Sequence, residues 1–113
     1  MEAIDRVLSS SVRAQARSVD SVFKNLVEEV GELSRALNRP WRCDEPAIGE
    51  AADVINCVID LVYMMEVESL ASQGIGEKAI NVPMLKRQIE HWVDHKCNKW
   101  DGLAEGMKNA AVE

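Results

Sequence analysis

The sequence has few aromatic residues, and its cysteines form no pattern of a disulfide framework or a structural zinc site. Aromatic side chains make up 4% of the 113 residues, and the apolar residues are mainly Val, Leu, Ile, Ala and Met, as is typical of helical proteins. Cys43, Cys57 and Cys97 are odd in number and lie far apart, without a CxxC pair. This cysteine usage is typical of a reducing compartment and predicts a cytoplasmic location.

Long apolar runs and an excess of positive charge are missing too. The longest apolar stretch, residues 54–65, is too short to span a bilayer and contains Asp60. Residues 1–17 carry charges throughout, without the apolar centre of a signal peptide. The formal net charge of −6 disfavours a general nucleic-acid binder, whose phosphate contacts need a basic surface. The sequence therefore predicts neither a membrane nor a nucleic-acid partner.

Several catalytic and nucleotide-binding motifs do not occur in the sequence. It has no P-loop, no GxGxxG, no GxSxG elbow and no Cys/His nucleophile arrangement. Triphosphate binding through a glycine-rich loop and covalent catalysis therefore have no support.

Length and apolar periodicity predict a single all-α domain over residues 1–113. The composition, 47% apolar and 28% charged, is that of a globular protein, and no segment has the alternating pattern of a β-strand. We expect a core over about residues 20–101 and a polar tail over residues 102–113, because Asp101 and Gly102 break the last helix. The expected elements are a short N-terminal helix over residues 3–17 and three main helices over about residues 21–38, 46–72 and 83–100.

The helix expected over residues 21–38 has one apolar stripe with an acidic cluster beside it. Glu29 flanks this stripe, whereas Glu28 and Glu32 point further away from it. A site built on these carboxylates therefore needs another helix or another subunit to enclose it. The stripe consists of Phe23, Leu26, Val27, Val30, Leu33 and Leu37.

The helix expected over residues 46–72 is apolar around nearly its whole circumference between residues 51 and 65, which predicts a central, buried helix. A polar line interrupts it, formed by Asp53, Asn56 and Asp60, with Glu50 one turn earlier. Carboxylates buried in such a helix cost free energy unless they are paired or bound to metal. The polar line is therefore expected to have a function.

Two pairs of carboxylates, Glu29 with Glu32 and Glu50 with Asp53, have the spacing of a shared site. Residues three apart on a helix lie on neighbouring turns, so each pair presents two carboxylates on one side of its helix. Four converging carboxylates repel one another unless cations lie between them, and hard oxygen ligands suit Mg²⁺ or Mn²⁺. The sequence predicts a Mg²⁺ site here, with Mn²⁺ as the alternative.

The two histidines, His91 and His95, are four residues apart but give little support for a metal site. A di-iron carboxylate bundle needs Glu-x-x-His, and neither histidine follows a glutamate by three residues. The glutamate of an HExxH motif is absent as well, and Asp94 lies between the histidines instead. We interpret both histidines as surface residues of an amphipathic helix.

Four basic and aromatic residues allow two interpretations each. Lys96, Lys99 and Trp100 are either favourable cations at a helix C-terminus with a core tryptophan, or contacts to phosphates and to a base. Trp41, between the two acidic helices, is either an anchor of its loop or a stacking surface for a base. From the sequence both alternatives stay open.

The acidic pattern resembles that of the MazG-like all-α nucleoside triphosphate pyrophosphohydrolases. That superfamily carries ExxE, a spacer and ExxD, which here are Glu29-x-x-Glu32 and Glu50-x-x-Asp53 inside LVEEVGELSRAL and GEAADVINCVIDLVY. The resemblance covers about residues 20–66. More loosely, the stretch Lys99-Trp100-Asp101-Gly102 resembles the end of small MazG-like chains.

The resemblance implies hydrolysis of a (d)NTP between the α and β phosphates, giving the monophosphate and pyrophosphate, in sanitising or control of the nucleotide pool. It also implies Mg²⁺ held by the two carboxylate pairs, and helical protomers that form a homodimer or homotetramer with a four-helix-bundle core. In this interpretation Glu28 is the candidate for orienting or deprotonating the attacking water. The candidates for substrate contacts are Trp41, Asn56, Lys96, Lys99 and Trp100.

Two alternatives to this function remain open. The related phosphoribosyl-ATP pyrophosphohydrolases of histidine synthesis are also short and all-helical, but they tend to place a Tyr-His pair where this sequence has Asn56-Cys57. From another class, the chain is a catalytically silent helical dimer that binds a protein partner. Such a module would have no need of four inward-facing carboxylates.

Overall fold

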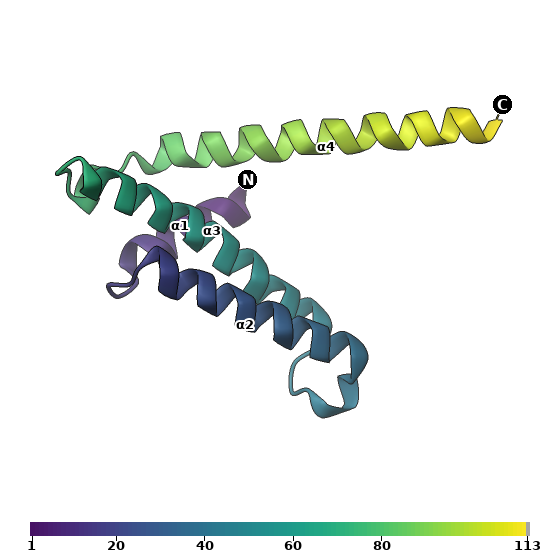
Figure 1. Cartoon of the computed structure of the whole chain (residues 1–113), viewed down its shortest axis with the longest axis horizontal. Coiled ribbons are helices and arrows are strands. Elements are labelled where there is room, and N and C mark those ends of the chain that lie inside the picture. Colours follow the sequence, from purple (N-terminus) through teal and green to yellow (C-terminus); the bar gives the residue numbers. More distant parts are fainter. Residues whose placement is uncertain (113) are drawn as a thin grey trace. The chain divides into compact units, whose positions relative to one another are not determined.

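The computed structural model describes residues 1–112 and, of the side chains, those of residues 1–106. Within this part of the chain the fold is all-helical without a strand, as predicted. The chain forms two compact units, one of residues 2–80 and one built on the last helix. The single domain expected over the whole chain stays a prediction. The elements, labelled in Figure 1, are α1 (Glu2–Arg13), α2 (Val19–Asn38), the 3₁₀ turn η1 (Pro40–Arg42), α3 (Ala47–Ser72), the 3₁₀ turn η2 (Glu77–Ala79) and α4 (Val82–Val112).

Helix α2 begins at Val19 because Ser18 caps it. The backbone N–H of Ser21 donates to Ser18 Oγ at 3.1 Å, and the backbone N–H of Ser18 donates to Ser21 Oγ at 3.1 Å. This reciprocal pair, a capping box, satisfies two backbone donors at the helix start. The helix ends at Asn38, as predicted, because Pro40 disfavours helical backbone in the residue before it.

Helix α3 covers Ala47–Ser72, within one residue of the predicted range, and it ends in a left-handed residue. Gly74 has a φ of +76°, a conformation that glycine adopts without steric cost. The backbone N–H of Ile75 then returns to the carbonyl of Leu70 at 2.9 Å, which satisfies one of the last helical carbonyls.

In the unit of residues 2–80, α2 and α3 lie side by side and are joined by residues 39–46 (Figure 1). Helix α1 packs on α3 as well. The hairpin of α2 and α3 carries both acidic motifs, so that the loop between them sets which turns face each other. The buried apolar side chains of this unit are Ile4, Leu8, Val22, Ala36, Ile59, Tyr63 and Met64.

Two expected helix ends were wrong. Helix α1 ends at Arg13 rather than at Arg17, because the residues after Arg13 form the connection to α2. Helix α4 continues through Asp101 and Gly102 to Val112. One glycine inside an exposed helix costs only about 1 kcal/mol, too little by itself to end a long helix.

Within a single chain helix α3 is not buried all round, so the burial predicted for it as a central helix is not complete in one copy. Several of its apolar side chains are exposed, and so are most of those in the predicted stripe of α2. The reason is that α2 and α1 cover only part of the circumference of α3 within one chain. The exposed residues are Phe23, Val27, Val30 and Leu37 on α2, and Ile48, Ile55, Val58 and Met65 on α3.

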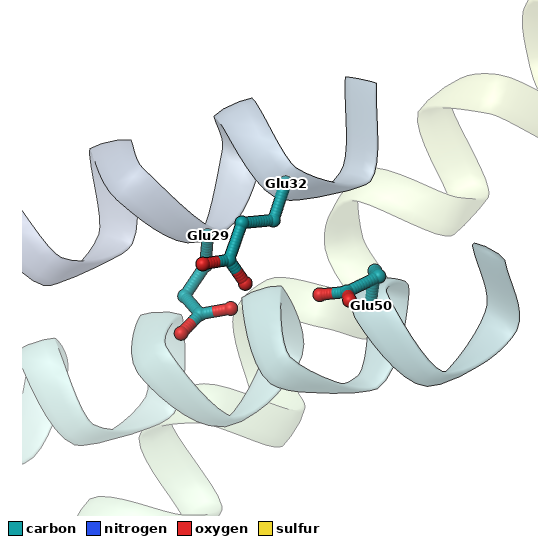
Figure 2. A group of neighbouring side chains, drawn as sticks. All are labelled: Glu29, Glu32 and Glu50. Atoms are coloured by element: carbon teal, nitrogen blue, oxygen red, sulfur yellow. The ribbon is translucent and has the colours of Figure 1, made fainter. Parts of the chain in front are cut away.

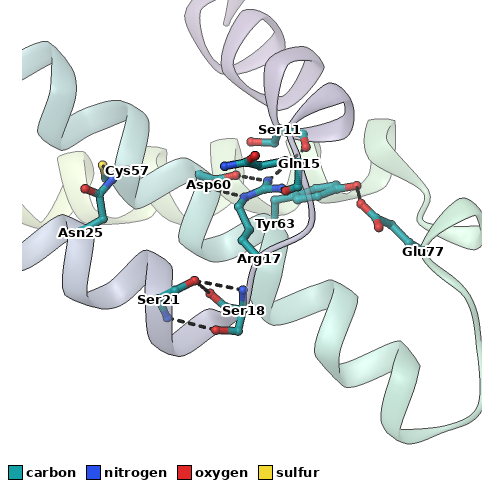
Figure 3. A network of polar contacts seen from close by, with 10 residues as sticks. All are labelled: Ser11, Gln15, Arg17, Ser18, Ser21, Asn25, Cys57, Asp60, Tyr63 and Glu77. Atoms are coloured by element: carbon teal, nitrogen blue, oxygen red, sulfur yellow. Dashed lines mark hydrogen bonds and ion pairs between the residues drawn. The ribbon is translucent and has the colours of Figure 1, made fainter.

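Arg17 fixes the connection between α1 and α2 onto α3 (Figure 3). Its guanidinium donates to both carboxylate oxygens of Asp60, at 3.0 Å from Nε, and to the backbone carbonyls of Gln15 and Ser11 at 2.9 and 3.0 Å. Burial alone would raise the pKa of Asp60, but hydrogen bonds from Arg17 and Ser11 and the charge of Arg17 outweigh it and lower the pKa. Asp60 of the polar line is therefore the partner of Arg17.

Tyr63 extends this network toward the end of α3. The guanidinium of Arg17 lies over the Tyr63 ring, 5.8 Å from its centroid, and the Tyr63 hydroxyl donates to Glu77 at 2.6 Å. Burial and the Glu77 carboxylate raise the pKa of Tyr63 to about 12. The polar line of α3 therefore has two roles. Asp60, its last member, holds the connection between α1 and α2 through Arg17, whereas Glu50 and Asp53 belong to the predicted metal site.

None of the helices in the described part of the chain combines the length and the apolar character needed to cross a membrane.

Candidate metal centre

Helices α2 and α3 bring three of the four predicted ligands into one group. One carboxylate oxygen from each of Glu29, Glu32 and Glu50 lies within 4.8 Å of the other two. Figure 2 shows Glu29 and Glu32 on neighbouring turns of α2, with carboxylates turned toward α3 and toward Glu50. The spacing of three residues on each helix produces this convergence, because it places both side chains on the same side of the helix.

The fourth predicted ligand, Asp53, belongs to a second group that shares Glu50 with the first. Carboxylate oxygens of Glu45, Glu50 and Asp53 all lie within 4.8 Å of one another. Glu45 was not predicted, because it precedes Pro46 and α3 and so has no helical spacing to Asp53. Together the two groups form a continuous set of five carboxylates, called here the carboxylate cluster.

Two oxygens of the carboxylate cluster are shielded from solvent and have no hydrogen-bond partner among the residues that the structure describes. They are Oε2 of Glu29 and Oε2 of Glu50. Burial, followed by the negative charges of Glu32 and Asp53, raises the pKa of Glu29. Burial, followed by the charges of Glu32 and Glu45, raises the pKa of Glu50. The cluster therefore favours any positive charge, a proton or a cation, that comes between its carboxylates.

The donor set fits a hard divalent cation. All clustered donors are carboxylate oxygens, the ligands that Mg²⁺ and Mn²⁺ prefer. An unpartnered, shielded carboxylate oxygen costs free energy that coordination would recover, and Glu29 and Glu50 each supply one. The residues present are thus those that the sequence predicts for Mg²⁺, with Glu45 in addition.

Asn56, a predicted substrate contact, lies one turn beyond Asp53 on α3 and lines a cavity between α1 and α3. The cavity has a volume of about 420 Å³, within the range of small-molecule sites. Asn25 on α2 donates to the Cys57 thiol at 3.4 Å, and burial raises the pKa of that thiol. The cavity is lined by Arg6, Val7, Ser10, Ser11, Ala14, Asn56, Cys57 and Asp60.

Of the remaining predicted residues, two belong to the same compact unit as the carboxylate cluster and three belong to the other unit. Glu28 is exposed on α2, and Trp41 in η1 is 76% exposed, which disfavours the interpretation of Trp41 as a loop anchor. Lys96, Lys99 and Trp100 are exposed residues of α4, in the other compact unit. The roles of these five residues stay predictions.

Two arginines beside the cluster were missed at the level of sequence. Arg35 and Arg42 line a hollow of about 340 Å³ together with five acidic residues. Arg35 follows Glu32 by three residues, so helical spacing could have found it. Arg42 lies in η1, where no periodicity indicates what it faces. The acidic residues of this hollow are Glu32, Asp44, Glu45, Glu50 and Asp53.

By its geometry, the site is an acidic cluster between two packed helices of an all-α protein. Comparisons with protein-family models, with curated proteins and with solved structures found no significant match to this chain. The likeness to MazG-like enzymes therefore stays a resemblance of motif and spacing.

Proposed function

We propose that the protein is a divalent-cation-dependent hydrolase that converts a nucleoside triphosphate into the monophosphate and pyrophosphate. The observation that carries the proposal is the pair of shielded, unpartnered oxygens of Glu29 and Glu50 within five converging carboxylates. Ordinary surface glutamates avoid such a position because it is costly without a cation. The ExxE and ExxD motifs, and their resemblance to the MazG-like pattern, supply the substrate class.

Glu29, Glu32, Glu50 and Asp53 are the residues that would hold Mg²⁺, with Glu45 as an additional ligand. When bound, the cation neutralises phosphate charge and polarises the attacked phosphorus. A locally cationic site is what an acidic protein needs to accept an anionic substrate.

In the proposed reaction, water attacks the α-phosphorus, the α–β bridging P–O bond breaks, and pyrophosphate leaves. Of the two protons of the water, one stays on the new α-phosphate oxygen and the other has to be removed by a base. Glu28, next to Glu29 in the chain, is the candidate for that base. Its exposure leaves the carboxylate free to accept a proton and release it to solvent.

We assign the nucleoside to the cavity between α1 and α3. Its volume of about 420 Å³ suits a small molecule, and its lining mixes apolar side chains with the Ser10 hydroxyl and the Asn56 amide. Asn56 connects this cavity to the carboxylate cluster through Asp53, one turn away on the same helix. A nucleoside in the cavity would therefore direct its phosphates toward the carboxylates.

The experiment that tests this function is pyrophosphate release from a panel of nucleoside triphosphates, canonical and modified, with Mg²⁺, Mn²⁺ or EDTA. We expect release with either cation and none with EDTA. Asp53→Asn should lower kcat by at least about 100-fold, because it removes a ligand while keeping shape. Glu66→Gln, elsewhere on α3, is the matched control and should keep full activity.

Silence of the folded protein across the panel, and on phosphoribosyl-ATP, would contradict the proposal. A second candidate function would then take its place, a helical module that associates through its exposed apolar faces. Those faces, on α2 and α3, are the observation that favours it.

A further inference from the structure

Three arginines gather at the C-terminal end of α2 and in η1. Arg35, Arg39 and Arg42 line a hollow of about 510 Å³, called here the arginine hollow. Arg35 and Arg42 also line the hollow that contains the carboxylates, so the two hollows share these side chains. The remaining lining residues of the arginine hollow are Gly31, Ser34 and Asn38.

None of the three guanidinium groups makes a hydrogen bond or an ion pair with a residue in the described part of the chain. This is notable for Arg35 and Arg42, because five acidic residues line the same hollow. The arginines therefore form no direct ion pair with the carboxylates in this part of the chain. The carboxylates can therefore bind a cation, and the neighbouring guanidinium groups can donate hydrogen bonds to an anion.

The order of residues along α2 matches an extended polyphosphate. Glu29, Glu32 and Arg35 follow one another on α2 at single-turn intervals of about 5 Å, and Arg39 comes directly after the last residue of the helix. Helix α3 shows the same order when it is followed from its middle toward its N-terminus. Asn56 comes first, then Asp53 and Glu50, and then the loop that carries Arg42. The nucleoside cavity thus lies at one end of the carboxylate cluster and the arginine hollow at the other.

We infer that Arg35, Arg39 and Arg42 form a subsite for the β and γ phosphates, the pyrophosphate end of the substrate. The planar guanidinium fork binds two phosphate oxygens at once, which suits a group with many equivalent oxygens. Ser34 accepts a hydrogen bond from Asn38 at 3.3 Å and keeps its own hydroxyl hydrogen for a phosphate. The inference rests on the proposed function. It implies that the enzyme distinguishes its substrates by the number of phosphate groups and not by charge alone.

The arginine hollow offers phosphate contacts in addition to those predicted for Lys96 and Lys99, which stay predictions. Lys96 and Lys99 lie on α4, whereas all three arginines belong to the same compact unit as the carboxylates. The subsite would select substrates by the length of their phosphate chain. A triphosphate that has its α-phosphate at the carboxylates extends its β and γ phosphates to the arginines, whereas a monophosphate does not.

The test combines pyrophosphate binding with steady-state kinetics on the full chain. Isothermal calorimetry with inorganic pyrophosphate and Mg²⁺ measures the subsite without turnover. Arg39→Gln lies outside the carboxylate hollow and should weaken pyrophosphate binding and raise KM for the triphosphate about tenfold each, with kcat changed much less. Arg35→Gln and Arg42→Gln should have at least that effect. Arg13→Gln, an exposed arginine of α1, is the control and should stay within about twofold of the parent.

The possible outcomes separate this inference from the proposed function. If the parent hydrolyses triphosphates while all three arginine variants bind pyrophosphate as the parent does, the subsite is wrong and the hydrolase stands. If the parent hydrolyses nothing but binds pyrophosphate through these arginines, the subsite stands without the hydrolase. Weaker binding by Arg13→Gln to the same degree would mean general charge attraction and would overturn the subsite.

Discussion

Glu50 takes part in both carboxylate groups, and it lies in the first turn of α3. The partial positive charge of a helix N-terminus favours a carboxylate there, whereas burial and the charges of Glu32 and Glu45 disfavour it and raise its pKa. This one side chain therefore has a carboxylate oxygen within 4.8 Å of each of the other four carboxylates in the cluster.

We expect Glu50→Gln to remove the stabilisation that Mg²⁺ gives, without lowering the stability of the cation-free protein. A cation that binds only the folded state adds about 2.7 kcal/mol at 100 times its Kd. Melting curves with Mg²⁺ and with EDTA measure this difference for the parent, for Glu50→Gln and for the control Glu66→Gln. A Mg²⁺-dependent rise in Tm that survives in Glu50→Gln would place the cation elsewhere.

At the same scale, the ion pair of Arg17 and Asp60 predicts a pH dependence of stability. The pKa of Asp60 is lower in the folded protein than in the unfolded chain. Its contribution is therefore complete above the ordinary aspartate pKa of about 3.9, and it is lost as the pH falls through the lower, folded value.

Asp60→Asn should cost about 2 kcal/mol of unfolding free energy at pH 7, because it leaves the guanidinium of Arg17 without its partner. The difference from the parent should shrink as the pH falls below about 4. Urea unfolding in EDTA at pH 7, 5 and 3 measures it. Lys24→Met breaks the exposed Lys24–Asp20 pair and should cost less than about 0.5 kcal/mol at each pH. A cost that does not change with pH would mean that packing, not charge, is lost.

At the scale of elements, two glycines distinguish a helix end from a helix interior. Gly74 ends α3 with a φ of +76°. Gly102 lies inside α4, where an added Cβ would meet no described atom within 4 Å apart from its chain neighbours and the nearby backbone of its own helix. The same substitution should therefore have opposite effects at these two positions.

Gly102→Ala should increase helicity and stabilise α4 by up to about 1 kcal/mol, because alanine favours helical backbone. Gly74→Ala should destabilise the protein by about 1–2 kcal/mol, since an L-residue is strained in the left-handed region. Circular dichroism and amide exchange over residues 98–106 measure the first effect, and urea unfolding measures the second. No gain of helicity in Gly102→Ala would support the helix break that the sequence suggested.

The two apolar faces of α2 and α3 belong to the scale of the whole molecule. Val27 is 56% and Ile55 is 55% exposed, and each lies in a stripe of residues with helical spacing. Paired helices with such stripes commonly bury them in a four-helix core, which a second copy of the α2–α3 hairpin would complete. This is the form of association that the resemblance to MazG-like chains also implies.

We expect a dimer or tetramer by sedimentation at micromolar concentration. Val27→Glu and Ile55→Glu should each shift it to monomer, because a charge in an apolar interface loses its hydration without a partner. Val12→Glu, at a half-exposed position of α1, is the matched control and should leave the assembly intact. A parent protein that sediments as a monomer would contradict the expected assembly through α2 and α3.

The sequence by itself determined the helices and the two acidic pairs. The end of α2, the range of α3 and the carboxylates at Glu29, Glu32, Glu50 and Asp53 all depend on spacing within one helix. Such spacing is local, because the geometry of 3.6 residues per turn is the same in every helix. The proline and serine signals at the helix ends are local in the same sense.

Only the tertiary structure decided which turns of α2 and α3 face each other, and therefore which further residues join the cluster. Glu45 and Arg42 come from the loop between the helices, where no periodicity fixes direction. Asp60 had the spacing of a site residue, but its partner Arg17 lies 43 positions away in the chain. These assignments depend on contacts between distant segments, and the free energy of such contacts is set by packing rather than by local sequence.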